Sequence, residues 1–237
     1  MSNSNRIRVA TYNIHSCIGT DGQFSPARVG EVLQQLDADV IALQELETKE
    51  ELGLSILAQF AEQTGMHAVP GPTLYRDDSS YGNALLIRNR PHTKLLLDIS
   101  YLQREPRGAI HIETEINSVP IRVIATHFGL KRIERKHQAD SLVKHLQQQK
   151  PLNPKAITIV LGDLNEWLPW GKPLLILKRL LQSVGSCATF PSRWPVLALD
   201  RVMIDPHYQN SEVAVVNTAL SRVASDHLPL LVDVFYQ

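Results

Sequence analysis

The sequence is poor in cysteine and has no excess of charge of either sign. Its two cysteines, Cys17 and Cys187, lie far apart and form no C-x-x-C pair, which argues against a redox pair or a cysteine metal site. The 24 Lys and Arg residues are balanced by 24 Asp and Glu residues, and the isoelectric point is about 7.1. This balance argues against a protein that grips long nucleic acid through many phosphates, but it leaves open a nucleic-acid substrate that is touched locally.

Long apolar runs are also missing. No run approaches the ~20 residues that a membrane-spanning helix needs. The polar residues 1–6 lead directly into a strand, unlike a secretion signal, so we expect a cytoplasmic protein with no transmembrane segment. Residues 173–181 could lie on a membrane surface, but one apolar face interrupted by Lys178 and Arg179 is more typical of a core helix.

The motifs of several enzyme classes are absent as well. The sequence has no Gly-x-Ser-x-Gly elbow of a serine hydrolase, no Gly-x-Gly-x-x-Gly of a dinucleotide-binding fold and no Gly-x-x-x-x-Gly-Lys loop of a nucleotide-binding protein. Any chemistry therefore depends on polar residues that are scattered along the chain and meet in the fold.

What the sequence does contain is an alternation of apolar strands and amphipathic helices over its 237 residues. A strand over 6–12 is followed by a helix that starts at Ser25-Pro26, a strand over 39–43 and a second helix that stops near Gly65. This alternation predicts an α/β fold. Because no segment resembles a linker, we expect a single domain over residues 1–237.

Polar residues stand where the predicted strands end. The apolar run 156–161 is typical of a strand buried on both faces, and Gly162, Asp163 and Asn165 follow it. Other predicted strands end at or beside Asn13, Glu45, His127, Asp200, Asp226 and His227. Since ligands of α/β sheets bind where strand ends converge, these groups could meet in one crevice.

Carboxylates and amides without a cysteine cluster suit a hard ion such as Mg²⁺ or Mn²⁺ and disfavour structural zinc. Phosphoester hydrolysis is the reaction that such a set performs well. The ion stabilises charge on phosphate oxygens, histidines donate hydrogen bonds or protons, and a carboxylate orients the attacking water.

One histidine is expected to have no such role. Residues 110–116 alternate between apolar and polar side chains, which is the period of a strand with one face in water. His111 is therefore expected to be a solvated strand residue.

Taken in order along the chain, these motifs resemble the endonuclease/exonuclease/phosphatase superfamily, whose fold is DNase-I-like. The resemblance is carried by TYNIH at 11–15, LQE at 43–45, YGNAL at 81–85, PRG at 106–108, THF at 126–128, GDLN at 162–165, LDR at 199–201 and SDH at 225–227. It implies a four-layer α/β/β/α sandwich of two packed mixed β-sheets flanked by helices.

The resemblance also implies roles for individual residues. Glu45 would be the main metal ligand, with Asn13 and Asp226 near the ion. Asp163 would orient or deprotonate the attacking water, and Asn165 would hold a phosphate oxygen.

Further roles follow by the same resemblance. His227 would contact the phosphate, oriented by Asp200. His127 would be a second catalytic histidine, and because abasic-site endonucleases of the superfamily have tyrosine at this position, it argues against abasic-site repair. The residues expected to bind substrate are Asn83, Arg107 and Arg135.

Within the superfamily the sequence looks similar to small bacterial metal-dependent hydrolases of the YbhP type. We expect a Mg²⁺- or Mn²⁺-dependent phosphodiesterase that acts on a phospholipid head group or on nucleic acid. The neutral charge and the tryptophans near residues 167–194 favour lipid, whereas the basic residues 131–136 favour a polyanion. A phosphomonoesterase acting on a soluble ester and a catalytically silent binding module on the same scaffold stay as alternatives.

Overall fold

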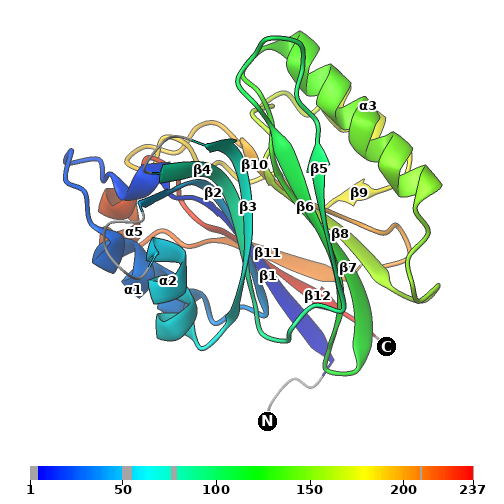
Figure 1. Ribbon diagram of the computed structural model, residues 1–237, viewed down its shortest axis with the longest axis horizontal. Coiled ribbons are helices and arrows are strands. Elements are labelled where there is room, and N and C mark those ends of the chain that lie inside the picture. The colour runs from blue at the N-terminus through cyan, green and yellow to red at the C-terminus, as the bar shows by residue number, and fades with distance from the viewer. Residues whose placement is uncertain (1–4, 50–54, 76–78, 209, 237) are drawn as a thin grey trace.

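The computed structural model describes residues 5–49, 55–75, 79–208 and 210–236. Two six-stranded sheets pack face to face, and helices lie on the outer face of each sheet (Figure 1). This arrangement confirms the predicted α/β/β/α sandwich of two mixed sheets.

The first sheet has the strand order β11-β12-β1-β2-β4-β3. Its strands are β1 (Arg6–Asn13), β2 (Val40–Lys49), β3 (His67–Tyr75), β4 (Ser79–Ile87), β11 (Ser211–Val215) and β12 (Leu230–Phe235). Strands β1 and β2 are parallel, and the other neighbours are antiparallel.

The second sheet has the order β5-β6-β7-β8-β10-β9. Its strands are β5 (Thr93–Asp98), β6 (Gly108–Ile116), β7 (Val119–His127), β8 (Ile157–Asp163), β9 (Gln182–Ser183) and β10 (Asp200–Ile204). Here β7 and β8 form the parallel pair, and the other neighbours are antiparallel.

A helix connects the two strands of each parallel pair. Helix α1 (Pro26–Leu36) lies between β1 and β2 in the chain, and α3 (Arg132–Gln148) lies between β7 and β8. The Ser25 side chain caps α1 by accepting a hydrogen bond from the Arg28 N–H, and Pro26 occupies the first turn, as the sequence predicted. These crossovers bring the carboxyl ends of the parallel strands to one edge of each sheet.

The remaining helices complete the outer layers. Helices α2 (Ile56–Thr64) and α5 (Ala219–Ala224) pack with α1 on the first sheet, and α4 (Lys172–Leu177) packs with α3 on the second. The apolar segment 173–181 thus contributes a short helix whose Pro173, Leu174, Ile176 and Leu177 are buried. Among the helices of the described residues, none is long and apolar enough to cross a membrane.

Side chains alternate between the layers along each central strand. Val9 of β1 belongs to the core between the two sheets, whereas its neighbour Ala10 packs toward the helices of the first sheet. Ile159 and Val160 of β8 divide in the same way between the central core and the α3 side. Because both faces of these strands are covered, side chains of either orientation are buried from Val9 to Asn13 of β1 and along all of β8.

The prediction that His111 is solvated is wrong. Its side chain is buried on the face of β6 that α3 covers, and His145 of α3 donates to or accepts from it, with His145 Nε2 2.9 Å from His111 Nδ1. The two rings meet edge to face at 5.0 Å between centroids. The alternating pattern described a polar face correctly but could not show that a helix covers it.

Candidate active site

Strand ends from both sheets meet at one edge of the sandwich. In the second sheet, the last residue of β8, Asp163, pairs in register with His127 of β7 on one side and with Asp200 of β10 on the other. From the first sheet, Asn13 at the end of β1 reaches across and donates from Nδ2 to Asp163 Oδ2 at 3.1 Å. The structure therefore brings these four groups together, although they are far apart in sequence.

The backbone is distorted where two of the polar residues leave their strands. Glu45 lies in an irregularity of β2, where the register with β4 shifts between Leu43 and Leu46, and its φ is 57°. Asn165 has a φ of 51°. A left-handed conformation is unfavourable for Glu, and such strain is concentrated at functional sites, whereas Asn tolerates it. The β2 irregularity places the Glu45 carboxylate beside Asn13, whose Nδ2 donates to Glu45 Oε1 at 2.9 Å.

Gly162 is required immediately before Asp163. Its φ is +148°, and a Cβ atom at this position would lie 1.8 Å from the Thr126 carbonyl oxygen of the neighbouring strand. No side chain fits such a gap, so only glycine lets β7 and β8 approach closely at the strand end that carries Asp163.

The Asp163 carboxylate is almost fully buried and held by amide donors. Its Oδ1 accepts a hydrogen bond from the Asn165 backbone N–H at 2.9 Å, and its Oδ2 accepts from Asn13. The Nε2 atoms of His127 and His227 lie 3.6 Å and 3.7 Å from the same Oδ2. Burial, followed by repulsion from Asp200, raises the pKa of Asp163 to about 6.

His127 is the neutral member of the histidine pair. Its Nδ1 lies 2.8 Å from Nη1 of Arg107, and a guanidinium can only donate, so Nδ1 accepts and the proton of the neutral ring is on Nε2. The amide nitrogen of Asn165 also lies 3.1 Å from Nε2. This contact does not set the position of the ring proton, because the amide donates to the Phe128 carbonyl at 2.8 Å. Burial and the nearby Arg107 charge hold the pKa of His127 well below its ordinary value.

His227 is the charged member of the pair. Its Nδ1 donates to Asp200 Oδ2 at 2.9 Å, and the Thr189 hydroxyl donates to the same oxygen at 2.5 Å. Burial opposes the charged form, but the Asp200 carboxylate outweighs it and raises the pKa of His227 to about 10. The Phe190 ring packs against the imidazole, with centroids 4.8 Å apart. The cation is therefore fixed in position beside Asp163.

These groups line a cavity of about 420 Å³. Its polar side consists of Glu45, Tyr81, Glu105, Arg107, His127, Asp163, Asn165 and His227, and its apolar side of Leu130, Trp167, Phe190, Leu197 and Leu199. The sequence motifs include Tyr81 in YGNAL without giving it a role, and they do not include Glu105. The Tyr81 hydroxyl hydrogen-bonds Glu45, and Glu105 pairs with Arg107 at 3.3 Å, so both shape the polar side.

Five predicted residues do not line this cavity. Two of them, Asn13 and Asp200, lie behind its wall and are hydrogen-bonded to lining residues. Asn83 is buried and donates from Nδ2 to the Gly108 carbonyl at 3.0 Å, which joins the first sheet to the second directly after Arg107. Arg135 is buried and paired with Glu166. Asp226 is partly exposed, and its Oδ1 is 3.9 Å from Nδ1 of His15. The predicted roles of Asn83, Arg135 and Asp226 in binding substrate or metal stay predictions.

The donor chemistry fits a hard divalent cation. Atoms of Asp163, Asp200 and His227 lie within 4.8 Å of one another, a spacing that could hold an ion. However, Nδ1 of His227 is hydrogen-bonded to Asp200, and a charged imidazole is not a ligand. The carboxylates of Glu45 and Asp163, bridged by Asn13, are two adjacent oxygen donors in the cavity wall, and such donors select Mg²⁺ or Mn²⁺ over softer metals.

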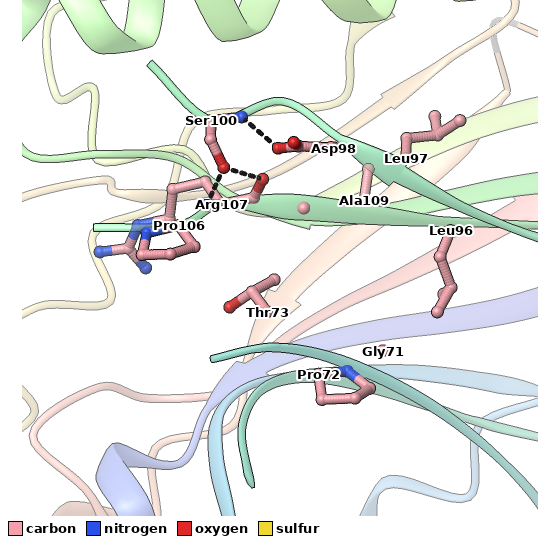
Figure 2. Close-up of a pocket in the computed structure, with 11 residues that line it drawn as sticks. Gly71, Pro72, Thr73, Leu96, Leu97, Asp98, Ser100, Pro106, Arg107 and Ala109 are labelled. Atoms are coloured by element: carbon pink, nitrogen blue, oxygen red, sulfur yellow. Dashed lines mark hydrogen bonds between the residues drawn. The ribbon is translucent and has the colours of Figure 1, made fainter. Parts of the chain in front are cut away.

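A second cavity, of about 240 Å³, lies on the other side of Arg107, between β3 and β5. Figure 2 shows the hydrogen bonds of Ser100 within it. The Ser100 hydroxyl donates to the Arg107 carbonyl at 3.3 Å and accepts from the Arg107 N–H at 3.0 Å, while the Ser100 N–H donates to Asp98 at 2.8 Å. Ser100 thus fixes the backbone from which Arg107 reaches His127.

Comparison with known proteins identifies the family. The model of the endonuclease/exonuclease/phosphatase family matches residues 10–227, which is most of the chain. The chain belongs to the endonuclease/exonuclease/phosphatase family. Members of this family hydrolyse phosphoester bonds and generally depend on a divalent metal. Comparison with curated protein sequences gave no significant match.

Several solved structures share the fold of this chain. A Beutenbergia cavernae member has a TM-score of 0.80 at 20% identity, covering 98% of this chain and 72% of that one. Truncated TDP2 from Caenorhabditis elegans has a TM-score of 0.74 at 15% identity, covering 98% of each chain. The mannosyl-6-phosphatase Bt3783 of Bacteroides thetaiotaomicron has a TM-score of 0.73 at 15% identity, covering 97% of this chain and 100% of that one.

Proposed function

We propose that this protein hydrolyses a phosphodiester, with Mg²⁺ or Mn²⁺ as its cofactor. The observation that carries the proposal is the placement of the Asp163 carboxylate between a neutral and a charged histidine, within 3.6–3.7 Å of both Nε2 atoms, at the wall of an open cavity. A carboxylate in this position can orient a water molecule, while the two ring N–H groups face the oxygens of a phosphate.

Each group then has a distinct task. The Nε2–H of His127 donates to a non-bridging phosphate oxygen, and the His227 imidazolium, held by Asp200, stabilises the charge that develops there. Asn165 holds a further phosphate oxygen. Arg107 also lines the cavity, and its guanidinium charge would attract the anionic phosphate.

Glu45 and Asp163 would hold the divalent ion, with Asn13 bridging their carboxylates. A bound Mg²⁺ or Mn²⁺ would supply charge stabilisation on the phosphate oxygens. The chain itself positions the carboxylates and keeps the Asp163 oxygens oriented through the Asn165 N–H and the Asn13 amide.

Charge balance favours a diester. Among the cavity-lining residues, the carboxylates of Glu45, Glu105 and Asp163 face the cations Arg107 and His227, which leaves one excess negative charge. A divalent ion turns this into one excess positive charge, which matches the single charge of a phosphodiester better than the double charge of a monoester. A phosphomonoesterase is the second candidate, because the same fold occurs in a protein described as a mannosyl-6-phosphatase.

The test is hydrolysis of bis(p-nitrophenyl) phosphate and p-nitrophenyl phosphate by the purified protein with Mg²⁺, Mn²⁺ or EDTA. Asp163→Asn and His227→Ala should abolish the metal-dependent activity. The matched controls are Asp140→Asn, on the exposed face of α3, and His207→Ala, whose side chain is 89% exposed; both should leave activity unchanged.

The outcomes separate the alternatives. Turnover that persists in both Asp163→Asn and His227→Ala would contradict the site. Faster hydrolysis of the monoester would favour the phosphomonoesterase, and no turnover of either ester, or of plasmid DNA or phospholipid vesicles, would favour a binding module. A single domain over 1–237 and a cytoplasmic location stay predictions.

A further inference from the structure

Trp167 stands at the mouth of the cavity on an unusually well-anchored loop. It follows Glu166, which is buried although it is charged. The Glu166 carboxylate accepts hydrogen bonds from the Leu168 N–H at 3.2 Å and from Arg135 Nη2 at 3.2 Å, and its carbonyl accepts from Arg201 Nη2 at 3.3 Å. Both residues that flank Trp167 are therefore fixed.

The anchoring uses three buried charges beneath one surface loop. Glu166, Arg135 and Arg201 are each 2% exposed. Burying charged groups is unfavourable unless they are paired, and replacing such a group by a well-packed apolar one is often neutral or stabilising, so stability alone gives little reason for the arrangement. Gly171 is adapted to it, because a Cβ there would lie 2.3 Å from the Glu166 carboxyl carbon.

Arg135 also supports the tryptophan ring directly. Its guanidinium carbon lies 5.9 Å from the Trp167 ring centroid, within the range of a cation–π contact, and its Nη1 donates to the Leu130 carbonyl at 2.6 Å. Leu130 and Trp167 both line the cavity, and Trp167 keeps 47% of its surface exposed. The ring is therefore held by a buried cation and still presents surface to the cavity.

We infer that Trp167 is a stacking platform for a planar aromatic group carried on the phosphate ester. This inference rests on the proposed function, because the ring must lie next to a phosphate held by His127 and His227. Leu130, Phe190, Leu197 and Leu199 line the same cavity and exclude water from such a group. Arg135 is a positioning residue in this account.

An aromatic ring fits these observations better than a lipid surface. A membrane contact needs apolar side chains that project outward, and Trp170 meets that description at 69% exposed and outside the cavity lining. Trp167 differs because it faces the cavity and is restrained by Arg135. Because Arg135 holds the Trp167 side chain in place before binding, little of its conformational freedom is lost when a flat ring stacks on it. This favours a planar partner. A nucleobase and an aryl ester share this chemistry.

The experiment compares phenylphosphonate with cyclohexylphosphonate by isothermal titration calorimetry, with Mg²⁺ and with EDTA. At a pH above the second ionisation of both phosphonates, the two ligands have the same charge and similar apolar size. Neither has an ester bond to hydrolyse, so the readout is binding and not turnover. AMP and ribose 5-phosphate, measured in the same way, distinguish a nucleobase from an aryl group. The proteins are the wild type, Trp167→Phe, Trp167→Leu and, as the matched control, Trp170→Leu.

We expect the wild type and Trp170→Leu to prefer the phenyl ligand about tenfold, Trp167→Phe to keep most of this preference and Trp167→Leu to lose it. Equal binding of both phosphonates by the wild type would overturn the platform but leave the proposed function intact. If no phosphonate and no bis(p-nitrophenyl) phosphate binds, both fail. A different outcome would assign the loop to a membrane instead. In that case Trp167→Leu and Trp170→Leu would both fail to bind phosphatidylcholine vesicles that the wild type binds, and the wild type would show no preference for the phenyl ligand.

Discussion

The guanidinium of Arg107 donates a hydrogen bond to Nδ1 of His127 at 2.8 Å and thereby fixes which ring nitrogen carries the proton. A carboxylate in the same place would favour a charged imidazole, as Asp200 does for His227. The two histidines beside Asp163 thus have partners of opposite charge, and one ring is neutral while the other is charged. One is a neutral hydrogen-bond donor, and the other is a permanent cation near neutral pH.

Replacing Arg107 should release this constraint. In Arg107→Met the pKa of His127 should rise, because a nearby cation that lowers it is gone, and kcat/KM should fall about 100-fold as an oriented donor is lost. The direct measurement is ¹⁵N NMR of the ring nitrogens in metal-free protein, where Nδ1 should be unprotonated only with Arg107 present. Arg193→Met, which removes an exposed guanidinium, is the control. Identical ring spectra would contradict the argument.

Asp200→Asn should shift the pH profile of kcat/KM on both sides. The Asp200 carboxylate is the main cause that raises the pKa of His227 to about 10, so the alkaline limb should move to lower pH. It also contributes to raising the pKa of Asp163 to about 6, so the acid limb should move down as well. Thr189→Val removes one hydrogen bond from Asp200 but keeps its charge, and should shift both limbs less. Limbs that stay in place would exclude Asp200 as the electrostatic partner.

Asp163→Asn should stabilise the metal-free protein while it removes activity. The pKa of Asp163 is raised to about 6 from 3.8, so the folded state favours the protonated form, and stability is lost as pH rises through 6. At pH 8 in EDTA the variant should gain about 1–3 kcal/mol in the free energy of unfolding, and at pH 4 the gain should be small. Urea unfolding at both pH values checks this, and a variant less stable than wild type at pH 8 would contradict it.

The strand ends that build the site could be predicted because each is a local pattern. A buried apolar run followed by a carboxylate or amide is visible in the sequence at Asp163 and Asn13, and the parallel crossovers then bring such ends to one edge. The edge strands were harder to predict. Strand β3 contains Pro70 and Pro72, which argue against a strand from sequence alone, and it is tolerated because it lies at the sheet edge.

Roles that depend on tertiary packing could not be predicted. The sequence shows Arg135 as part of a basic helix start, yet the fold buries it against Glu166, 31 residues later. Tyr81 and Glu105 reach the cavity only because β4 and the segment before β6 converge on Arg107 and Glu45. Such contacts between distant segments leave no periodic signal in the chain.

The buried pair His111 and His145 should make stability depend on pH. Burial, then the neighbouring His145 and Arg122, lowers the pKa of His111 to about 4, and that of His145 is lowered as well. The unfolded chain therefore binds more protons below pH 6.5, so the stabilisation is complete above that pH and is lost as pH falls. Between pH 6.5 and pH 5, His111 alone should account for a loss of about 2 kcal/mol. Urea unfolding of His111→Met should show a smaller loss, whereas exposed His207→Ala should match the wild type.

Gly162→Ala tests whether the close approach of β7 and β8 positions Asp163. A Cβ would meet the Thr126 carbonyl oxygen at 1.8 Å, so the strands must separate or the strand end must rotate. We expect a loss of about 2–4 kcal/mol in the free energy of unfolding and a fall in kcat, because Asp163 is the next residue.

The matched control is Gly22→Ala, where φ is +76° but no atom lies within 4 Å of the new Cβ. It should lose only about 1 kcal/mol, with unchanged kcat. Equal effects of the two substitutions would mean that backbone strain alone, and not the contact between the strands, explains the glycine at position 162.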